Sequence, residues 1–371
     1  MDENITIPQD LLPHDGRFGS GPSKVRPQAL QELAHEHSGV MGTSHRQAPV
    51  RALIARLKEG LGDLFGLPPG YEVLLGLGGA TLLWDALAYS FIEHRSQHVV
   101  VGEFSARFAE TIAAAPHLAS PELIEAPLGA VAYPRASAEP DVYALIHNET
   151  STGVCLPVVR VGGDGLVVVD ATSAAGGMWV DPLEFDVYYF SPQKCFASDG
   201  GLWVALCSEA AVDRIASVTA RRYVPPSLDL GLSLVNTRKD QTYNTPALAT
   251  LILMLNQIEW ILEAGGLEWA AARCEESSSC LYSWAEVTPF ATPFVAQESA
   301  RSPVVGTIDF DDSVDAAAVA RILRRNGIVD TEPYRKLGRN QLRIGMYPAV
   351  EPSDVERLTH CVDFVVGTMS R

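Results

Sequence analysis

The chain has 371 residues, and because Lys and Arg number 28 against 45 Asp and Glu, its formal net charge is −17. At about 150 residues per domain, this length predicts two domains, and the hydrophobic fraction of 47% indicates a folded globular protein. Such an acidic surface repels phosphodiester backbones and anionic lipids. We therefore expect neither nucleic acid nor a membrane as a partner.

No run of 18 uncharged apolar residues occurs, so we predict no membrane span. The first fifteen residues carry four acidic side chains and no Lys or Arg, unlike a secretory or transit peptide, and we expect a cytoplasmic protein. The six cysteines show no CxxC and no spacing with His that suggests a metal site. We expect reduced thiols and no bound metal.

Between about residues 70 and 207, short apolar runs alternate with amphipathic stretches, a pattern typical of a mainly parallel sheet covered by helices. This region is predicted to be an α/β domain. The predicted helices are Pro49–Phe65, Thr81–Glu93 and Ser105–Ala114. The predicted strands are Glu72–Leu75, His98–Val101, Val142–Ile146, Leu166–Val169, Val187–Phe190 and Leu202–Leu206.

After Thr245 the pattern changes to a smaller α+β arrangement. The predicted helices are Pro246–Leu262, Leu267 to about Trp284, Val314–Asn326 and Glu351–Val366, and the predicted strands are Val304–Phe310 and Leu342–Met346. We therefore predict a large domain over residues 17–264 and a small C-terminal domain over residues 265–371, with residues 1–16 lying on the smaller domain.

The segment DVYYFSPQKCFASDGG, residues 186–201, is the most informative for chemistry because it places Lys194 after a hydrophobic strand. Ligands of α/β sheets bind at the carboxyl ends of parallel strands. A lysine that is partly desolvated there has a lowered pKa and can attack an aldehyde such as that of pyridoxal phosphate. The alternative is an ordinary surface lysine after a strand.

Asp170 ends the preceding strand of the predicted sheet, before the small-residue stretch ATSAAGG. A carboxylate in this place can accept a hydrogen bond from a pyridinium N–H. Taken alone, Asp170 is better explained as an ordinary turn or helix-cap aspartate. Asp170 and Lys194 together, one strand apart, could hold both ends of the same ring system.

Three weaker signals follow other strands. Small residues at Gly78–Thr81 open a helix, whose N-terminus could bind a phosphate. Phe104 could stack on a planar cofactor, and a hydroxyl of the polar run 147–153, which follows the strand Val142–Ile146, could donate to a phenolate oxygen. Core packing and turn formation use the same residues.

Two groups of cations stand out in this acidic chain and could recognise anionic substrates. One contains His45 and Arg46. The other lies within nine residues that include no acid and contains Arg335, Lys336, Arg339 and Arg343. A solvated surface is the alternative for both groups.

Taken together, these segments resemble the phosphoserine aminotransferase family in its actinobacterial form, among the fold-type-I pyridoxal-phosphate enzymes. The resemblance covers nearly the whole chain. It implies a pyridoxal 5'-phosphate-binding domain with a mainly parallel seven-stranded sheet and a smaller α+β C-terminal domain. The motifs that carry it are RFGSGPSKVRP (17–27), GTSHRQAPV (42–50), GGAT (78–81), GEFSARF (102–108), HNETSTGV (147–154), VDATSAAGG (169–177), SPQKCFASDGGLW (191–203), QTYNTPA (241–247) and residues 330–352.

The resemblance also implies a role for each matching residue. Lys194 matches the lysine that bonds to the cofactor aldehyde, Asp170 the partner of its ring nitrogen, and Thr150 the contact of its phenolate oxygen. Phe104 stands where the family usually has a stacked tryptophan. The residues implied to bind the cofactor phosphate are Ala80, Thr81, Gln193 and, from the neighbouring subunit of a homodimer, Asn244 and Thr245.

The implied substrate contacts are Ser20, His45, Arg46 and Arg343, with Arg343 holding the α-carboxylate. The better-known bacterial branch has an arginine at the position of Thr81 and a His-Arg pair for the substrate phosphate. Which cation replaces that pair is left open among Arg335, Lys336 and Arg339.

The implied activity is transfer of the amino group of L-glutamate to 3-phosphohydroxypyruvate, giving O-phospho-L-serine and 2-oxoglutarate in L-serine biosynthesis by a ping-pong mechanism. The nearest alternative is a related enzyme such as a serine–glyoxylate or alanine–glyoxylate aminotransferase. A cofactor-binding protein without catalysis is another. A cysteine desulfurase is disfavoured because Cys195 fits strand-end packing.

Overall fold

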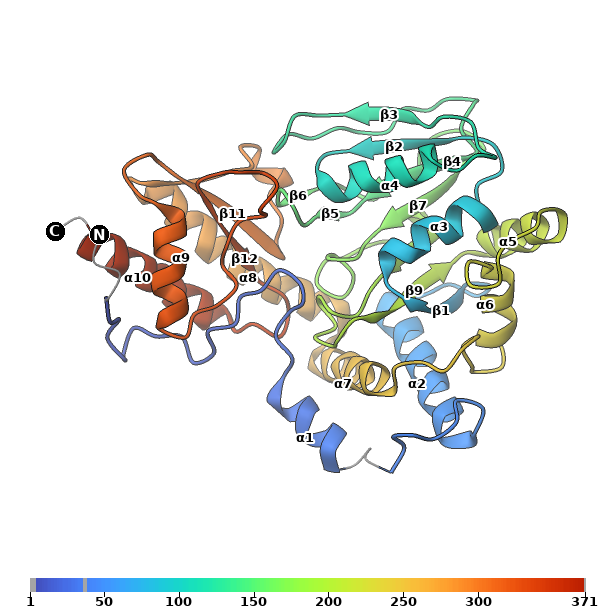
Figure 1. The fold of residues 1–371 in the computed structure, drawn as a ribbon, viewed down its shortest axis with the longest axis horizontal. Coiled ribbons are helices and arrows are strands. Elements are labelled where there is room, and N and C mark those ends of the chain that lie inside the picture. The colour runs from blue at the N-terminus through green and yellow to red at the C-terminus, as the bar shows by residue number, and fades with distance from the viewer. Residues whose placement is uncertain (1–4, 36–38, 370–371) are drawn as a thin grey trace.

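The computed structural model describes residues 5–35 and 39–369, which form two lobes that lie side by side (Figure 1). The larger lobe is built on a seven-stranded sheet and the smaller on a three-stranded sheet. In the larger sheet, β9 is antiparallel to both of its neighbours and the remaining pairs are parallel. Its strands, in spatial order, are β1 (Glu72–Gly78), β9 (Gly201–Cys207), β8 (Val187–Phe190), β7 (Leu166–Asp170), β4 (Val142–Ile146), β2 (Ser96–Val100) and β3 (Glu122–Glu125).

Both faces of the large sheet are covered, because successive residues of each strand point to opposite sides. Val73 and Leu75 belong to one buried cluster, which includes α2 and α7, whereas Leu74 belongs to another, which includes α3 to α6. The helices of the larger lobe are α1 (Pro27–His35), α2 (Ala48–Phe65), α3 (Ala80–Ser90), α4 (Glu103–Ala113), α5 (Glu209–Arg221), α6 (Leu230–Thr237) and α7 (Leu248–Ala264). A two-stranded ribbon, β5 (Asn148–Glu149) with β6 (Val154–Cys155), follows β4.

The smaller lobe packs three helices on an antiparallel sheet. Its strands are β10 (Ala291–Pro293), β11 (Val305–Phe310) and β12 (Gln341–Gly345), and its helices are α8 (Gly266–Val287), α9 (Ala316–Arg325) and α10 (Pro352–Met369). Ile7 and Phe18 lie in its core, so the N-terminal segment runs over this lobe. Helix α8 contributes to both cores. Cys274, near its middle, belongs to the core of the larger lobe, and Leu281, about two turns later, belongs to the core of the smaller one.

The predicted α/β class and the mainly parallel seven-stranded sheet are confirmed, and the six strands predicted for this sheet and the two predicted for the smaller lobe are all present. The sequence analysis missed strands β3, β5, β6 and β10 and helices α1, α5 and α6. The helix predicted over Thr81–Glu93 ends at Ser90, where the Ser90 hydroxyl donates to Leu228 O over 2.8 Å. The division at residues 264 and 265 stays a prediction.

Within the described ranges, no single helix is long and apolar enough to cross a membrane; only α7 and α8 taken together would be, and they meet at a bend of 90°. In the same ranges, no group of three or more His, Cys, Asp or Glu side chains could hold a metal ion.

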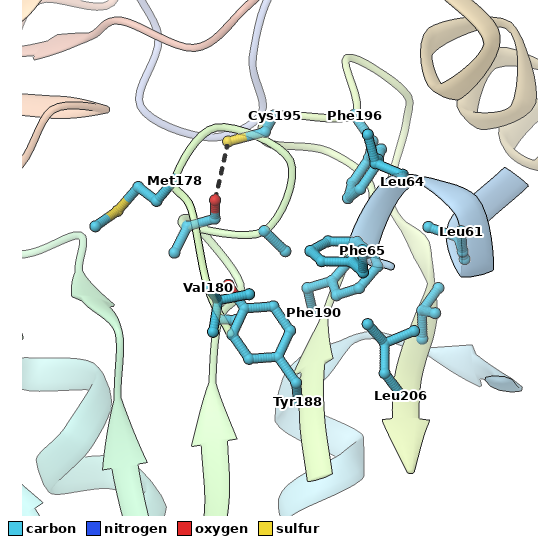
Figure 2. Close-up of a cluster of buried hydrophobic side chains, with 14 of the residues drawn as sticks. Leu61, Leu64, Phe65, Met178, Val180, Tyr188, Phe190, Cys195, Phe196 and Leu206 are labelled. Carbon is cyan, nitrogen blue, oxygen red and sulfur yellow. Dashed lines mark hydrogen bonds between the residues drawn. The ribbon is translucent and has the colours of Figure 1, made fainter. Parts of the chain in front are cut away.

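An aromatic cluster joins α2 to the large sheet below the turn that carries Cys195 and Phe196 (Figure 2). The Phe65 ring lies 5.7 Å from the Tyr188 ring and 6.1 Å from the Phe190 ring, measured between centroids. Phe190 stacks on Phe196 at 4.8 Å. Because Phe196 follows Lys194 by two residues, this cluster fixes the end of the turn.

We expect Phe65→Ala to lower the free energy of unfolding by about 3–5 kcal/mol, because it leaves a cavity in a packed core. Urea unfolding followed by far-UV circular dichroism measures the change. Val287→Ala is the control, since Val287 is 82% exposed and a surface change of this kind costs at most about 0.5 kcal/mol. Equal losses in the two variants would contradict the packing role of Phe65.

Candidate active site

A cavity of about 370 Å³ opens at the carboxyl ends of the parallel strands, beside the smaller lobe. Ile146 and Asp170 end β4 and β7 there, as expected for a ligand site of an α/β sheet. The cavity collects seven of the site residues predicted from the sequence: Ala80, Thr81, Phe104, Thr150, Asp170, Gln193 and Lys194.

Lys194 is buried, and its Nζ donates to the main-chain oxygen of Ser20 over 2.6 Å. The hydroxyl of Tyr347 donates to the same oxygen over 2.7 Å. Burial, and to a lesser degree the nearby charge of Arg343, lowers the pKa of Lys194 from 10.5 to about 8. A substantial share of Lys194 is therefore neutral near pH 8, and a neutral amine can attack a carbonyl carbon or accept a proton.

Asp170 lies on the floor of the cavity at the end of a chain of hydrogen bonds. Trp84 Nε1 donates to the Tyr189 hydroxyl over 2.8 Å, which in turn donates to Asp170 Oδ2 over 3.0 Å. Thr172 N donates to Oδ1 over 2.9 Å. Burial raises the pKa of Asp170, and these donors oppose that shift. A cationic N–H placed in the cavity beside Asp170 would stabilise its charged form against the cost of burial.

The start of α3 forms another wall. Ser191, which follows β8, accepts a hydrogen bond at Oγ from Ala80 N over 2.7 Å. Gly79 precedes Ala80, so no side chain caps the helix at that position. Thr81 is exposed at the mouth. The positive end of the helix dipole therefore faces the cavity and favours an anion there.

Three buried polar atoms of cavity residues have no hydrogen-bond partner among residues 5–35 and 39–369. They are Asn148 Oδ1, Thr172 Oγ1 and Gln193 Oε1. Thr150 Oγ1, by contrast, donates to Ser173 Oγ over 2.8 Å. Buried polar groups are rarely left unpaired in folded proteins, so these atoms indicate that the cavity is built for a polar ligand.

Tyr334, from the segment between α9 and β12, connects two of the predicted site residues. Its ring centroid lies 5.7 Å from that of Phe104 and 5.3 Å from the guanidinium carbon of Arg343. Arg343 Nη1 donates to Thr150 O over 3.2 Å, while its Nε is buried without a partner. Burial lowers the pKa of Arg343. Arg343 thus reaches the cavity wall with one donor still free.

The other three cations of this segment go to separate places. Lys336 forms an ion pair with Glu103, at the start of α4. Arg339 donates Nε to both carboxylate oxygens of Asp309 over 3.1 Å and covers the Phe294 ring at 4.3 Å. Arg335 is exposed, and no ion pair of it is found in the described part of the chain.

His45, Arg46, Asn244 and Thr245 do not line the cavity of their own chain. Thr245 Oγ1 lies 3.2 Å from His45 Nδ1, so the two predicted segments meet each other. His45 is buried with Nε2 unpaired, whereas Arg46 and Asn244 are exposed. His45, Arg46, Asn244 and Thr245 thus form a second polar cluster on the larger lobe, outside the cavity that contains Lys194.

The sequence analysis gave no role to Tyr189, Thr172, Tyr334 or Tyr347. Strand alternation could have identified Tyr189, because successive residues of a strand point to opposite faces of the sheet and Tyr189 therefore points away from the face of Tyr188. No sequence signal identifies Tyr334 or Tyr347, because their contacts join segments far apart in the chain.

The class-V aminotransferase family model matches residues 18–358. A phosphoserine aminotransferase of a Nocardioides species is 57% identical over 371 residues, covering 99% of each chain, and that of Rhodococcus jostii is 55% identical over 372 residues, covering 100% of each. The crystal structure of a phosphoserine aminotransferase from Cytophaga hutchinsonii has a TM-score of 0.87 at 24% identity and covers 94% of this chain and 99% of its own. The chain therefore belongs to the class-V aminotransferases, and within them to the phosphoserine aminotransferase family.

Proposed function

We propose that the chain transfers the amino group of L-glutamate to 3-phosphohydroxypyruvate, producing 2-oxoglutarate and O-phospho-L-serine for L-serine biosynthesis. The observation that carries the proposal is the buried amine of Lys194, with a pKa lowered to about 8, facing the same cavity as the Asp170 carboxylate. Full-length identity of 55–57% to phosphoserine aminotransferases supports the choice of substrates.

The residues around the cavity fit pyridoxal phosphate. Asp170 can accept from the ring N–H, and the α3 N-terminus with Gln193 can hold the phosphate. The unpaired atoms of Asn148, Thr172 and Gln193 supply polar partners for the remainder. When bound, pyridoxal phosphate supplies an aldehyde that takes up an amino group and a ring that draws electrons from the carbon beside it.

Lys194 then acts as the base and the acid of the reaction. Its neutral Nζ takes the α-proton of the amino acid, and the resulting ammonium returns a proton during the same half-reaction. A pKa of about 8 suits both directions near neutral pH. The oxygen of Ser20, 2.6 Å away, holds the amine inside the cavity while it carries the proton.

Three further side chains orient the cofactor ring. The negative charge of Asp170, supported by the Tyr189 hydroxyl, keeps a proton on the ring nitrogen. Phe104 packs on the ring face, and Thr150 donates its hydroxyl to the phenolate oxygen once its bond to Ser173 is exchanged. These roles follow from the family resemblance and from the position of each residue at the cavity.

The substrate carboxylate is assigned to Arg343, because its Nε is buried without a partner beside Thr150. Among the three cations left open by the sequence, Lys336 is the best candidate for the second anionic group of the substrate. Arg339 already contacts both oxygens of Asp309. Lys336, in contrast, is exposed, and an incoming phosphate or γ-carboxylate can replace its ion-pair partner, the half-buried Glu103.

We further propose a cytoplasmic homodimer in which Asn244 and Thr245 reach the cofactor phosphate of the partner chain and His45 and Arg46 its substrate. The placement of these residues outside their own cavity supports this arrangement. Thr81 adds no positive charge to the phosphate site, so polar contacts from the partner would complete it.

The test of the reaction is a two-step titration of the purified holoenzyme. L-Glutamate alone should convert the cofactor absorption to that of its amine form, and 3-phosphohydroxypyruvate should restore it, with O-phosphoserine identified by mass spectrometry. Lys194→Ala should keep its far-UV circular dichroism and lose turnover. Turnover of glyoxylate without turnover of 3-phosphohydroxypyruvate would favour a glyoxylate aminotransferase instead.

Gly21→Ala should displace the amine of Lys194 and so lower activity, although Lys194 itself is unchanged. A Cβ at Gly21 would lie 2.2 Å from Lys194 Nζ, and the φ of Gly21 is +139°. Because misplacement of a reacting group by about 1 Å can cost about 100-fold in rate, we expect kcat to fall by about that factor. The matched control is Gly367→Ala in α10, where a Cβ meets nothing within 4 Å; it should leave kcat unchanged.

Arg343→Lys keeps the charge but loses the forked donor. Loss of charge-assisted hydrogen bonds worth about 1.5–3 kcal/mol corresponds to about a ten- to hundredfold increase in KM. Both L-glutamate and 3-phosphohydroxypyruvate should be affected, since each has an α-carboxylate. Steady-state kinetics measure the effect, with Arg357→Lys as control because Arg357 donates to the main-chain oxygens of Asp10 and Leu12, in the N-terminal segment that lies on the smaller lobe. An increase confined to one substrate would contradict the assignment.

A further inference from the structure

Glu149 is a fully buried carboxylate next to the cavity that the mechanism above does not use. It ends β5 and stands between Asn148 and Thr150, both of which line the cavity. Glu149 itself is not among the lining residues, and its carboxylate is turned toward the start of α4. A buried carboxylate is costly unless it is well paired, and its partners therefore indicate its purpose.

The partners of Glu149 are all hydrogen-bond donors, and most of them begin α4. Its Oε1 accepts from Phe104 N over 3.3 Å, and its Oε2 accepts from Ser105 N over 3.0 Å and from Ser105 Oγ over 2.9 Å. Ser151 donates N and Oγ to Oε1 over 3.2 and 2.7 Å. Ser151 Oγ also accepts from Glu103 N over 3.0 Å. Glu149 and Ser151 thus satisfy the first three N–H groups of the helix.

Helices are normally capped by the residue that precedes them, but α4 follows Gly102, which has no side chain. A Cβ at Gly102 would lie 2.5 Å from Glu149 Cγ and 2.6 Å from Ser151 Oγ. Because glycine at position 102 has no side chain, the Glu149 side chain has room to reach the start of α4. The start of α4 is therefore fixed to β5 as well as to its own preceding segment, where Ser105 Oγ accepts from Val101 N over 3.0 Å and from Gly102 N over 3.1 Å.

This link matters because Phe104 is the second residue of α4 and its ring lines the cavity. Through Glu149, the main chain of Phe104 is held against the segment that carries Thr150. The carboxylate charge is stabilised by the helix dipole and faces the charges of Lys194 and Arg343, whose pKa values it raises.

We propose that Glu149 is a positioning residue that fixes Phe104 over the cofactor ring by capping α4 from the neighbouring strand. The proposal rests on the cofactor site of the proposed function and does not depend on which oxo acid accepts the amino group. A cap that served only stability would leave the geometry of the bound cofactor unchanged.

Glu149→Gln is the test. The amide keeps the size of the side chain, but its NH₂ group must face a backbone N–H where the carboxylate accepted a hydrogen bond. We expect the visible circular dichroism of bound pyridoxal phosphate to fall by about half or more and its Kd to rise about tenfold. If Glu149→Gln does not fold, Glu149→Asp, which is one methylene too short to reach both N–H groups, is measured in its place.

The matched control is Asp315→Asn at the start of α9. Asp315 also accepts from two successive N–H groups, those of Ala317 and Ala318, but in the smaller lobe and away from the cavity. It should lower Tm and leave the dichroism and the Kd of pyridoxal phosphate unchanged. If Glu149→Gln behaves in the same way as this control, the proposal is wrong.

A double variant tests whether Glu149 acts through Phe104. Phe104→Leu alone should reduce the dichroism, and adding Glu149→Gln should reduce it no further, because the ring that Glu149 holds is already gone. Independent and additive losses would overturn the proposal. Failure of the proposed function would appear in the wild-type protein as bound cofactor without phosphoserine formation. The dichroism of the Glu149 and Phe104 variants could still be compared in that case.

Discussion

A single main-chain oxygen, that of Ser20, is the point on which the site depends. It accepts from Lys194 Nζ of the larger lobe and from the hydroxyl of Tyr347, which follows β12 of the smaller lobe. Burial disfavours the charged form of Lys194. The neutral oxygen of Ser20 accepts a hydrogen bond from the ammonium but stabilises it less than a carboxylate would, so the amine can still lose its proton. The N-terminal segment, the sheet of the larger lobe and the end of β12 must all be in place before the amine can be held.

The parts of the site that follow strands could be predicted from the sequence. Asp170 and Lys194 each come after an apolar run, and a parallel sheet brings the carboxyl ends of such runs to one edge. The glycine-bounded start of α3 was found for the same reason. The short edge strand β3, in contrast, begins and ends with glutamate and alternates between half-buried and exposed residues, so it lacks the continuous apolar run that identified the equally short β8.

Contacts between distant segments could not be predicted. Lys336 and Arg339 appear in the sequence as members of one cationic group, yet the structure directs them to Glu103 of the larger lobe and Asp309 of the smaller one. His45 and Thr245 are 200 residues apart and meet through the packing of the larger lobe. Glu149 looks like a turn residue in HNETSTG until the start of α4 is placed beside it. Such partners depend on three-dimensional packing, which no local periodicity records.

Helix α8 has a mechanical consequence for the two lobes. At 1.5 Å per residue, its 22 residues form a rod of about 33 Å, with Cys274 in one core and Leu281 in the other. A rod clamped at both ends transmits torque, so the smaller lobe cannot swing freely about a flexible joint. A rotation of the smaller lobe would therefore have to bend this helix or withdraw part of it from one of the two packed cores.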